Sequence, residues 1–104
     1  MTTQLYLQKA EMQLAKGLEE KALESLLAAL DFWDDDIVGK TQARCFVGEC
    51  FFVHQRYTQA QEQFKWIADR AEWLEQEYDD LLNEELKKAE TVSYTHLRAH
   101  ETKA

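Results

Sequence analysis

Proline is missing from this 104-residue sequence, and glycine occurs only three times, at positions 17, 39 and 48. A sheet of many strands needs tight turns, and proline and glycine make most of those turns. The composition therefore argues against an all-β fold and predicts an all-α fold. With 45% hydrophobic residues, the chain has enough apolar side chains for one small domain.

Long apolar runs are also missing. No stretch reaches 18 consecutive apolar residues, and Met1 is followed by a short polar run and not by a basic and then an apolar segment. We expect neither a membrane-spanning helix nor a signal peptide. Cys45 and Cys50 lie on one predicted helix, where their thiols are neighbours without being placed to bridge, so we expect both to be free and reduced. These features favour a cytoplasmic location.

Positive charge is scarce. Twelve Lys and Arg stand against 20 Asp and Glu, which gives a formal net charge of −8. A negative net charge opposes binding to the phosphates of nucleic acids and to anionic membrane surfaces. We therefore expect no nucleic acid and no membrane as partner.

Apolar side chains recur at intervals of three and four residues, which is the period of one buried helical face. Gly17 ends the first such run, and the acids Asp34 to Asp36 end the second and serve as N-cap for the third. We expect Thr58 to cap the last helix. The pattern predicts antiparallel hairpins made of helices over about Leu5–Leu14, Ala22–Trp33, Ile37–His54 and Thr58–Ala89.

The last predicted helix is long for so small a domain. Neither glycine nor proline interrupts the segment from Thr58 to Ala89, so one helix of about 30 residues is the simplest interpretation. A break at residues 75–77 is the alternative. The apolar residues of this run include Phe64, Leu74 and Leu81.

An internal repeat is the strongest pattern in the sequence. Residues 17–29 align with residues 55–67 at an offset of 38, so that small residues fall on small ones and apolar residues on apolar ones. The equivalent pairs are Ala10 and Gly48, Ala22 and Ala60, Leu26 and Phe64, and Ala29 and Ile67. We expect the small residues to lie where helices cross.

The second unit reads Val47-Gly48-x-x-Phe51-Phe52, followed by Tyr57-x-x-Ala60-x-x-x-Phe64. It resembles the tetratricopeptide repeat, whose signature is Leu-Gly-x-x-Tyr and then Tyr-x-x-Ala-x-x-x-Phe. The resemblance covers about residues 3–70 and implies two repeats within a domain over residues 1–90. The offset of 38 exceeds the usual 34 and puts extra residues between Trp33 and Gly39. The resemblance also implies that the C-terminal helix, or another chain, covers the second repeat.

The resemblance implies a concave groove lined by the first helix of each repeat. Its residues here are Gln4, Leu7, Glu11, Leu14, Gln42, Cys45, Glu49, Phe52 and Val53. Family members that bind a terminal carboxylate use Lys and Asn at positions held here by Leu7, Glu11, Cys45 and Glu49, so we expect no such binding. A peptide with an apolar anchor and basic flanks suits this groove better. The alternative is that Phe52 and Val53 pack on a neighbouring helix.

The resemblance therefore favours a protein-protein interaction module that acts as a scaffold. A helical homo-oligomer is the alternative, with anchors at Trp66, Trp73 and Tyr78 on the long helix. A small acidic chaperone with the same repeat fold is a third hypothesis, which rests on analogy.

Catalytic and metal-binding patterns are weak. The sequence has no Gly-rich phosphate loop, and Ser25 and Ser93 have no evident histidine partner. Cys50 and His54 lie four apart and are the one pair that resembles a nucleophile and its base, although packing explains them better. His96 and His100 have no further ligand nearby in the sequence. We expect no enzyme activity, no cofactor and no metal.

Residues 91–104 differ from the rest in composition. They carry two of the three histidines and do not continue the apolar stripe. The string Val-Ser-Tyr-Thr-His-Leu-Arg-Ala-His resembles translated sequencing-adaptor DNA. We therefore expect a non-native or disordered tail that adds nothing to the fold.

Overall fold

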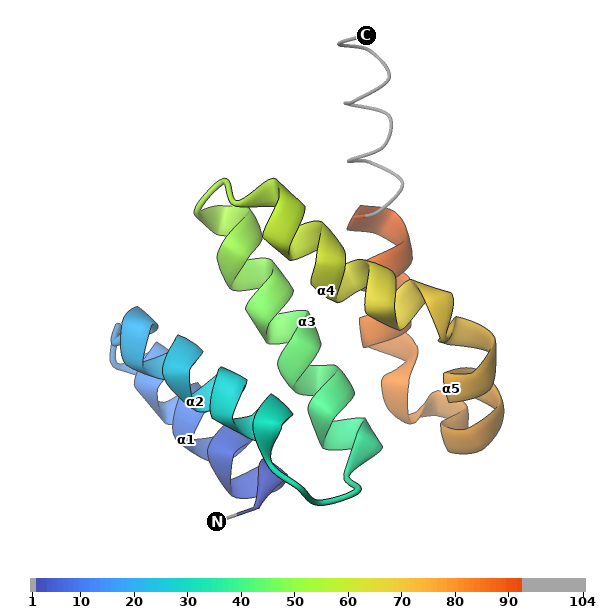
Figure 1. The fold of residues 1–104 in the computed structure, drawn as a ribbon, viewed down its shortest axis with the longest axis horizontal. Coiled ribbons are helices and arrows are strands. Elements are labelled where there is room, and N and C mark those ends of the chain that lie inside the picture. The colour runs from blue at the N-terminus through green and yellow to red at the C-terminus, as the bar shows by residue number, and fades with distance from the viewer. Residues whose placement is uncertain (1, 93–104) are drawn as a thin grey trace, which may run out of the picture.

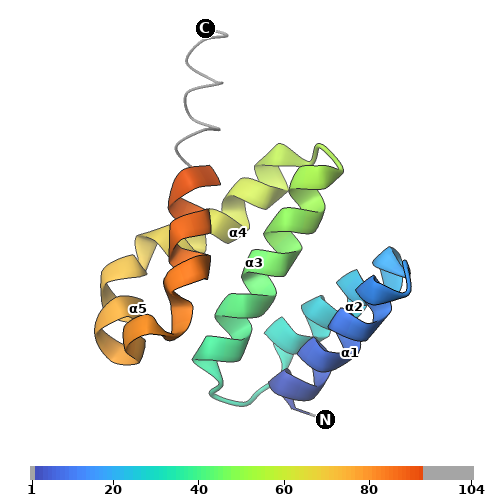
Figure 2. The same ribbon diagram turned by 180° about the vertical axis from the view of Figure 1, so that it is seen from behind.

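The computed structural model describes residues 2–92, and all regular structure in that range is helical, which confirms the predicted all-α fold (Figures 1 and 2). Residues 83–92 form a helical segment after the last named element. Within residues 2–92, no helix is both long enough and apolar enough to cross a membrane. The named elements are α1 (Thr3–Ala15), α2 (Glu19–Asp31), α3 (Ile37–Val53), α4 (Tyr57–Asp69), α5 (Ala71–Tyr78) and the 3-10 helix η1 (Asp79–Leu82).

Two antiparallel hairpins, α1 with α2 and α3 with α4, make up most of the molecule (Figure 1). The positions paired by the 38-residue offset are buried in both hairpins, from Ala10 and Leu26 in the first to Gly48 and Phe64 in the second. Each hairpin thus presents the same small and apolar positions to one shared core. The paired positions of both units therefore face the core.

The turns of the two hairpins also repeat at the same offset. Both are Schellman motifs, in which a residue with positive φ ends the helix and two backbone bonds satisfy its last carbonyls. Gly17 has φ 76° in the first turn and Gln55 has φ 62° in the second. The bonds are Gly17 N–H to Leu14 O (3.0 Å), Leu18 N–H to Gln13 O (2.8 Å), Gln55 N–H to Phe52 O (3.0 Å) and Arg56 N–H to Phe51 O (2.8 Å).

The acidic connection between α2 and α3 caps two helices. The Asp36 carboxylate accepts the Gly39 N–H at 2.9 Å, which confirms the expected N-cap of α3. The Asp34 carboxylate accepts the backbone N–H of Thr3 at 3.0 Å and pairs with Lys40 at 3.3 Å. The connection between α2 and α3 therefore links the first turn of α1 to the first turn of α3.

The prediction of one long C-terminal helix is wrong. Helix α4 ends at Asp69, α5 ends at Tyr78, and Asp79 has φ 49°, after which residues 83–92 turn back (Figure 2). A straight helix of 30 residues would span about 45 Å and carry its second half beyond the core. The reversal instead buries Leu82 completely and leaves Leu81 66% exposed.

Two further expectations need correction. Helix α4 begins at Tyr57, and no side chain caps it, so Thr58 is not an N-cap. Residues 91 and 92 continue the helical segment, and Val92 packs against the core. The rest of the expected tail, residues 93–104, lies outside the described part of the chain.

Candidate binding cleft

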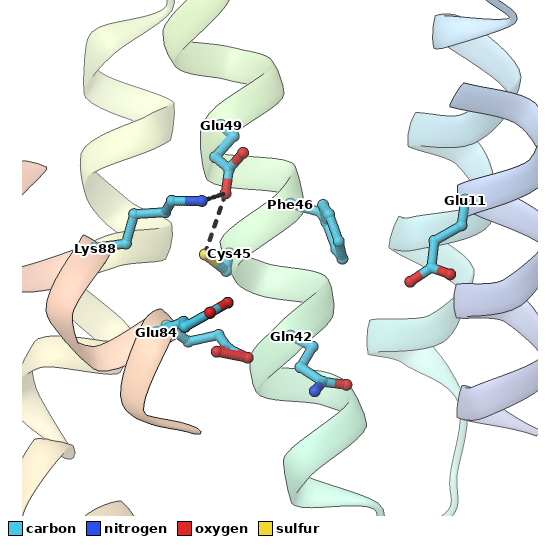
Figure 3. A pocket seen from close by; sticks show the side chains of 8 residues that line it. Glu11, Gln42, Cys45, Phe46, Glu49, Glu84 and Lys88 are labelled. Atoms are coloured by element: carbon cyan, nitrogen blue, oxygen red, sulfur yellow. Dashed lines mark hydrogen bonds and ion pairs between the residues drawn. The ribbon is translucent and has the colours of Figure 1, made fainter. Parts of the chain in front are cut away.

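A cleft of about 350 Å³ lies between α1, α3 and the segment 83–92 (Figure 3). Helix α3 forms its floor, Glu11 of α1 faces it from one side, and Glu84 and Lys88 face it from the other. We call it the acidic cleft. Its lining residues are Glu11, Gln42, Cys45, Phe46, Glu49, Glu84, Glu85 and Lys88.

Four of the residues predicted for the groove line this cleft, namely Glu11, Gln42, Cys45 and Glu49. The helical period explains why three of them lie together, because positions 42, 45 and 49 share one face of α3. Sequence reasoning missed the contribution of residues 83–92, because it expected a straight helix that could not return to α3.

The other predicted groove residues lie elsewhere. Leu7 is buried in the core at 4% exposure, and Leu14 is half-buried against that core. Phe52 is exposed and meets the Tyr57 ring at 5.3 Å between centroids, and Val53 is 71% exposed beside it at the end of α3. The Gln4 amide donates to the Asp36 carboxylate at 2.9 Å. None of these residues lines the acidic cleft.

Glu49 is the charge centre of the α3 side. Its Oε1 atom accepts from Lys88 Nζ at 2.8 Å and from the Cys45 thiol at 3.5 Å (Figure 3). Within residues 2–92, Glu11, Glu84 and Glu85 form no ion pair. The cleft therefore has three carboxylates outside any ion pair of the described residues, and one lysine, Lys88, in the same lining as the half-buried ring of Phe46.

The Cys45 thiol is held protonated. Burial, reinforced by the charge of Glu49, raises its pKa to about 12. The hydrogen bond and charge of Glu49 likewise raise the pKa of Lys88. Because the thiolate is the reactive form of cysteine, Cys45 serves here as a hydrogen-bond donor and not as a nucleophile.

Cys50 and His54 lie in a second cleft, where the first turn of α2 meets the last turn of α3. The His54 Nε2 atom is 3.1 Å from Glu19 Oε2, so its partner is a carboxylate. Burial, together with Glu19 and Glu49, raises the pKa of the Cys50 thiol. This arrangement does not activate Cys50 as a nucleophile.

The described range, residues 2–92, contains no group of three or more His, Cys, Asp or Glu residues placed to hold a metal ion. The candidate ligands His96 and His100 lie outside that range. No protein-family model matches this chain, and neither a curated protein nor a solved structure does.

Proposed function

We propose that this chain is a protein-interaction module of two tetratricopeptide-like hairpins that binds a peptide segment of a partner in the acidic cleft. Support for the repeat comes from the 38-residue offset, which relates both the buried positions and the two Schellman turns. In such an arrangement α1 and α3 are the first helices of the two units, and residues 83–92 take the position that a third unit would fill. We also propose a cytoplasmic location, which the two free thiols support.

The observation that carries the proposal is the excess of carboxylates in the cleft, where Glu11, Glu84 and Glu85 lie outside any ion pair of residues 2–92 around Phe46. Carboxylates on both sides of the cleft attract lysine and arginine side chains and speed the encounter with a basic segment. The Phe46 ring gives an apolar anchor a place to pack. The partner segment is therefore basic at its flanks and apolar at its centre. A terminal carboxylate is opposed by the same charges.

A matched pair of synthetic peptides tests this proposal. One is a capped 12-residue peptide with a central leucine pair and lysine flanks, and the other has glutamate flanks. We expect the lysine peptide alone to bind, as measured by fluorescence anisotropy at low salt. The double variant Glu11→Lys, Glu84→Lys should weaken binding about tenfold or more, because it reverses two charges in the cleft.

The control is Glu24→Lys, Glu62→Lys, which makes the same change in net charge at exposed positions of α2 and α4. An equal loss of affinity in this control would show that net charge, and not the cleft, attracts the peptide. Equal binding of both peptides by the unmodified chain would also contradict the proposal.

A second candidate function is self-association through the chain reversal. Trp73 is 44% exposed and stands edge-on to Tyr78 at 6.0 Å, and Leu81 is 66% exposed. Trp66, the third predicted anchor, is half-buried and has Arg44 over its ring. If this surface joins two copies, light scattering will give a dimer mass that Trp73→Ser with Leu81→Ser reduces to that of a monomer. A monomer at high concentration in the unmodified chain would end this candidate.

A further inference from the structure

Trp66 of α4 is contacted by two arginines. Arg44 of α3 lies over the indole ring with its guanidinium carbon 4.3 Å from the ring centroid. Arg70, between α4 and α5, lies over the same ring at 4.2 Å. Cation–π contact holds each guanidinium in place, but the two cations repel each other.

No carboxylate balances these charges within residues 2–92, although the whole chain has a net charge of −8. The nearest acid in sequence, Asp69, pairs with Lys65 at 2.7 Å. Arg44 donates to the Gln63 side chain at 3.1 Å, and Arg70 donates to the Trp66 carbonyl at the same distance. Both acceptors are neutral.

Arg44 has an unmet hydrogen bond as well. Its Nε atom is buried and has no acceptor within residues 2–92. Buried polar atoms nearly always find a partner, whereas Arg44 is held by its packing on Trp66 and not by a full set of hydrogen bonds. Burial, and then the charge of Arg70, lower the pKa of Arg44. The guanidinium nevertheless stays charged at neutral pH, because arginine does not lose its proton in proteins.

The corresponding positions of the first hairpin carry no charge. At the offset of 38, Arg44 and Arg70 correspond to Tyr6 and Phe32. Those two rings meet edge to face at 5.9 Å. An apolar aromatic pair therefore fills the equivalent place in one unit, and a pair of cations fills it in the other.

We propose that Arg44, Trp66 and Arg70 form a binding site for an oxyanion, either a carboxylate or a phosphate group. Guanidinium forks match the oxygens of both groups and bind them through charge-assisted hydrogen bonds. The oxyanion would offset the repulsion between the two cations. The site uses α3 and α4, shares no residue with the acidic cleft and is independent of the proposed peptide binding.

The test follows the fluorescence of Trp66 alone. Trp33→Phe and Trp73→Phe remove the other two tryptophans, which are 84% and 44% exposed. Inorganic phosphate and acetate are titrated separately into this double variant, with sodium chloride holding the ionic strength constant. We expect a saturable change in emission for at least one anion. The anion with the higher affinity identifies the group that the site prefers.

Arginine variants in the same background decide whether the site is the cause. Arg44→Gln and Arg70→Gln should each weaken anion binding about tenfold, because each removes a charge-assisted donor. Arg56→Gln, at the exposed turn between α3 and α4, is the matched control and should leave the affinity unchanged. If Arg44→Gln does not fold by circular dichroism, Arg44→Lys keeps the charge, loses the planar fork and should still weaken binding.

The proposal is overturned if neither anion gives a saturable change in the parent. It is also overturned if binding survives in folded Arg44→Gln and Arg70→Gln, or if the Arg56 control loses as much affinity as they do. Thermal melts give a second measurement. Phosphate or acetate should raise the melting temperature of the unmodified chain and not that of the two arginine variants.

Discussion

The Phe64 ring of α4 lies against Gly48 of α3 so closely that a Cβ at Gly48 would stand 2.7 Å from the Phe64 Cε2 atom. Phe64 is completely buried and cannot swing away into solvent. The close approach of α3 and α4 therefore depends on the absence of a side chain at position 48. In the first hairpin the equivalent pair is Ala10 with the smaller Leu26, and both are buried.

Gly48→Ala should destabilise the fold. Helix propensity alone would favour alanine by about 1 kcal/mol, but a Cβ placed 2.7 Å from a buried ring should cost toward the upper end of the about 1 to 3 kcal/mol typical of overpacking, which outweighs that gain. Urea unfolding followed by circular dichroism measures the change. Adding Phe64→Leu recreates the Ala10 and Leu26 pair of the first hairpin and should cost less than the two single changes together. A neutral Gly48→Ala would contradict the role assigned to this contact.

Gln55→Gly should stabilise the protein by about 1 kcal/mol. Gln55 has φ 62°, a left-handed conformation that costs a residue with a Cβ about 1 to 2 kcal/mol and costs glycine little. Glycine loses more backbone entropy on folding than glutamine does, and this difference offsets part of the gain. Thermal melts should show the increase. Gln55→Ala is the control, because it removes the long side chain and keeps the strain, and an equal gain in that variant would contradict the explanation.

Asp34 should give the fold a pH-dependent stability. Hydrogen bonds from the Thr3 side chain and backbone hold the Asp34 pKa at about 2, below its ordinary 3.8, with smaller contributions from Asp36 and Lys40. Because the folded pKa is lowered, the stabilisation is complete above the unfolded pKa and is lost as the pH falls through 4 toward 2. We expect the difference in unfolding free energy between the native chain and Asp34→Asn to shrink over that window. A difference that stays constant from pH 6 to pH 2 would show that the Asp34 charge does not stabilise the fold.

Cys45 should react slowly with thiol reagents in the folded state. With its pKa raised to about 12, only on the order of one thiol in ten thousand is ionised at pH 8. Labelling of a Cys50→Ala variant, which leaves Cys45 as the only cysteine, measures the rate. Adding Glu49→Gln removes the neighbouring charge and should speed the reaction by lowering the pKa. Identical rates with and without Glu49→Gln would mean that access alone protects the thiol.

The helices and the repeat follow from local patterns, which is why the sequence predicts them. Apolar spacing places Leu26 and Phe64 on inner faces, and the glycine at position 17 ends α1 where expected. The acidic run before α3 is a capping signal that acts over three residues, from Asp36 to Gly39. Such signals depend on near neighbours only, so no tertiary information is needed to interpret them.

The contact between Asp34 of the acidic run and the first turn of α1 could not be predicted in the same way. Asp34 contacts Thr3 across 31 residues, and nothing in either local sequence indicates that pairing. The same limit applies to the contact between Trp66 and Arg44, because Arg44 lies on another helix, α3. A sequence pattern along one helix shows which face is buried, but not which long side chains from another helix reach it.

The sequence by itself determined the helical class, the approximate extent of the first three helices and many of the positions that face the core, because spacing and capping operate within a few residues. Only the tertiary structure decided where the chain reverses after Tyr78. Helical periodicity continues through that point in the sequence, so burial of Leu82 and Ala89 selects the turn, which Asp79 accommodates with φ 49°. That reversal brings Glu84 and Lys88 opposite α3 and completes the acidic cleft.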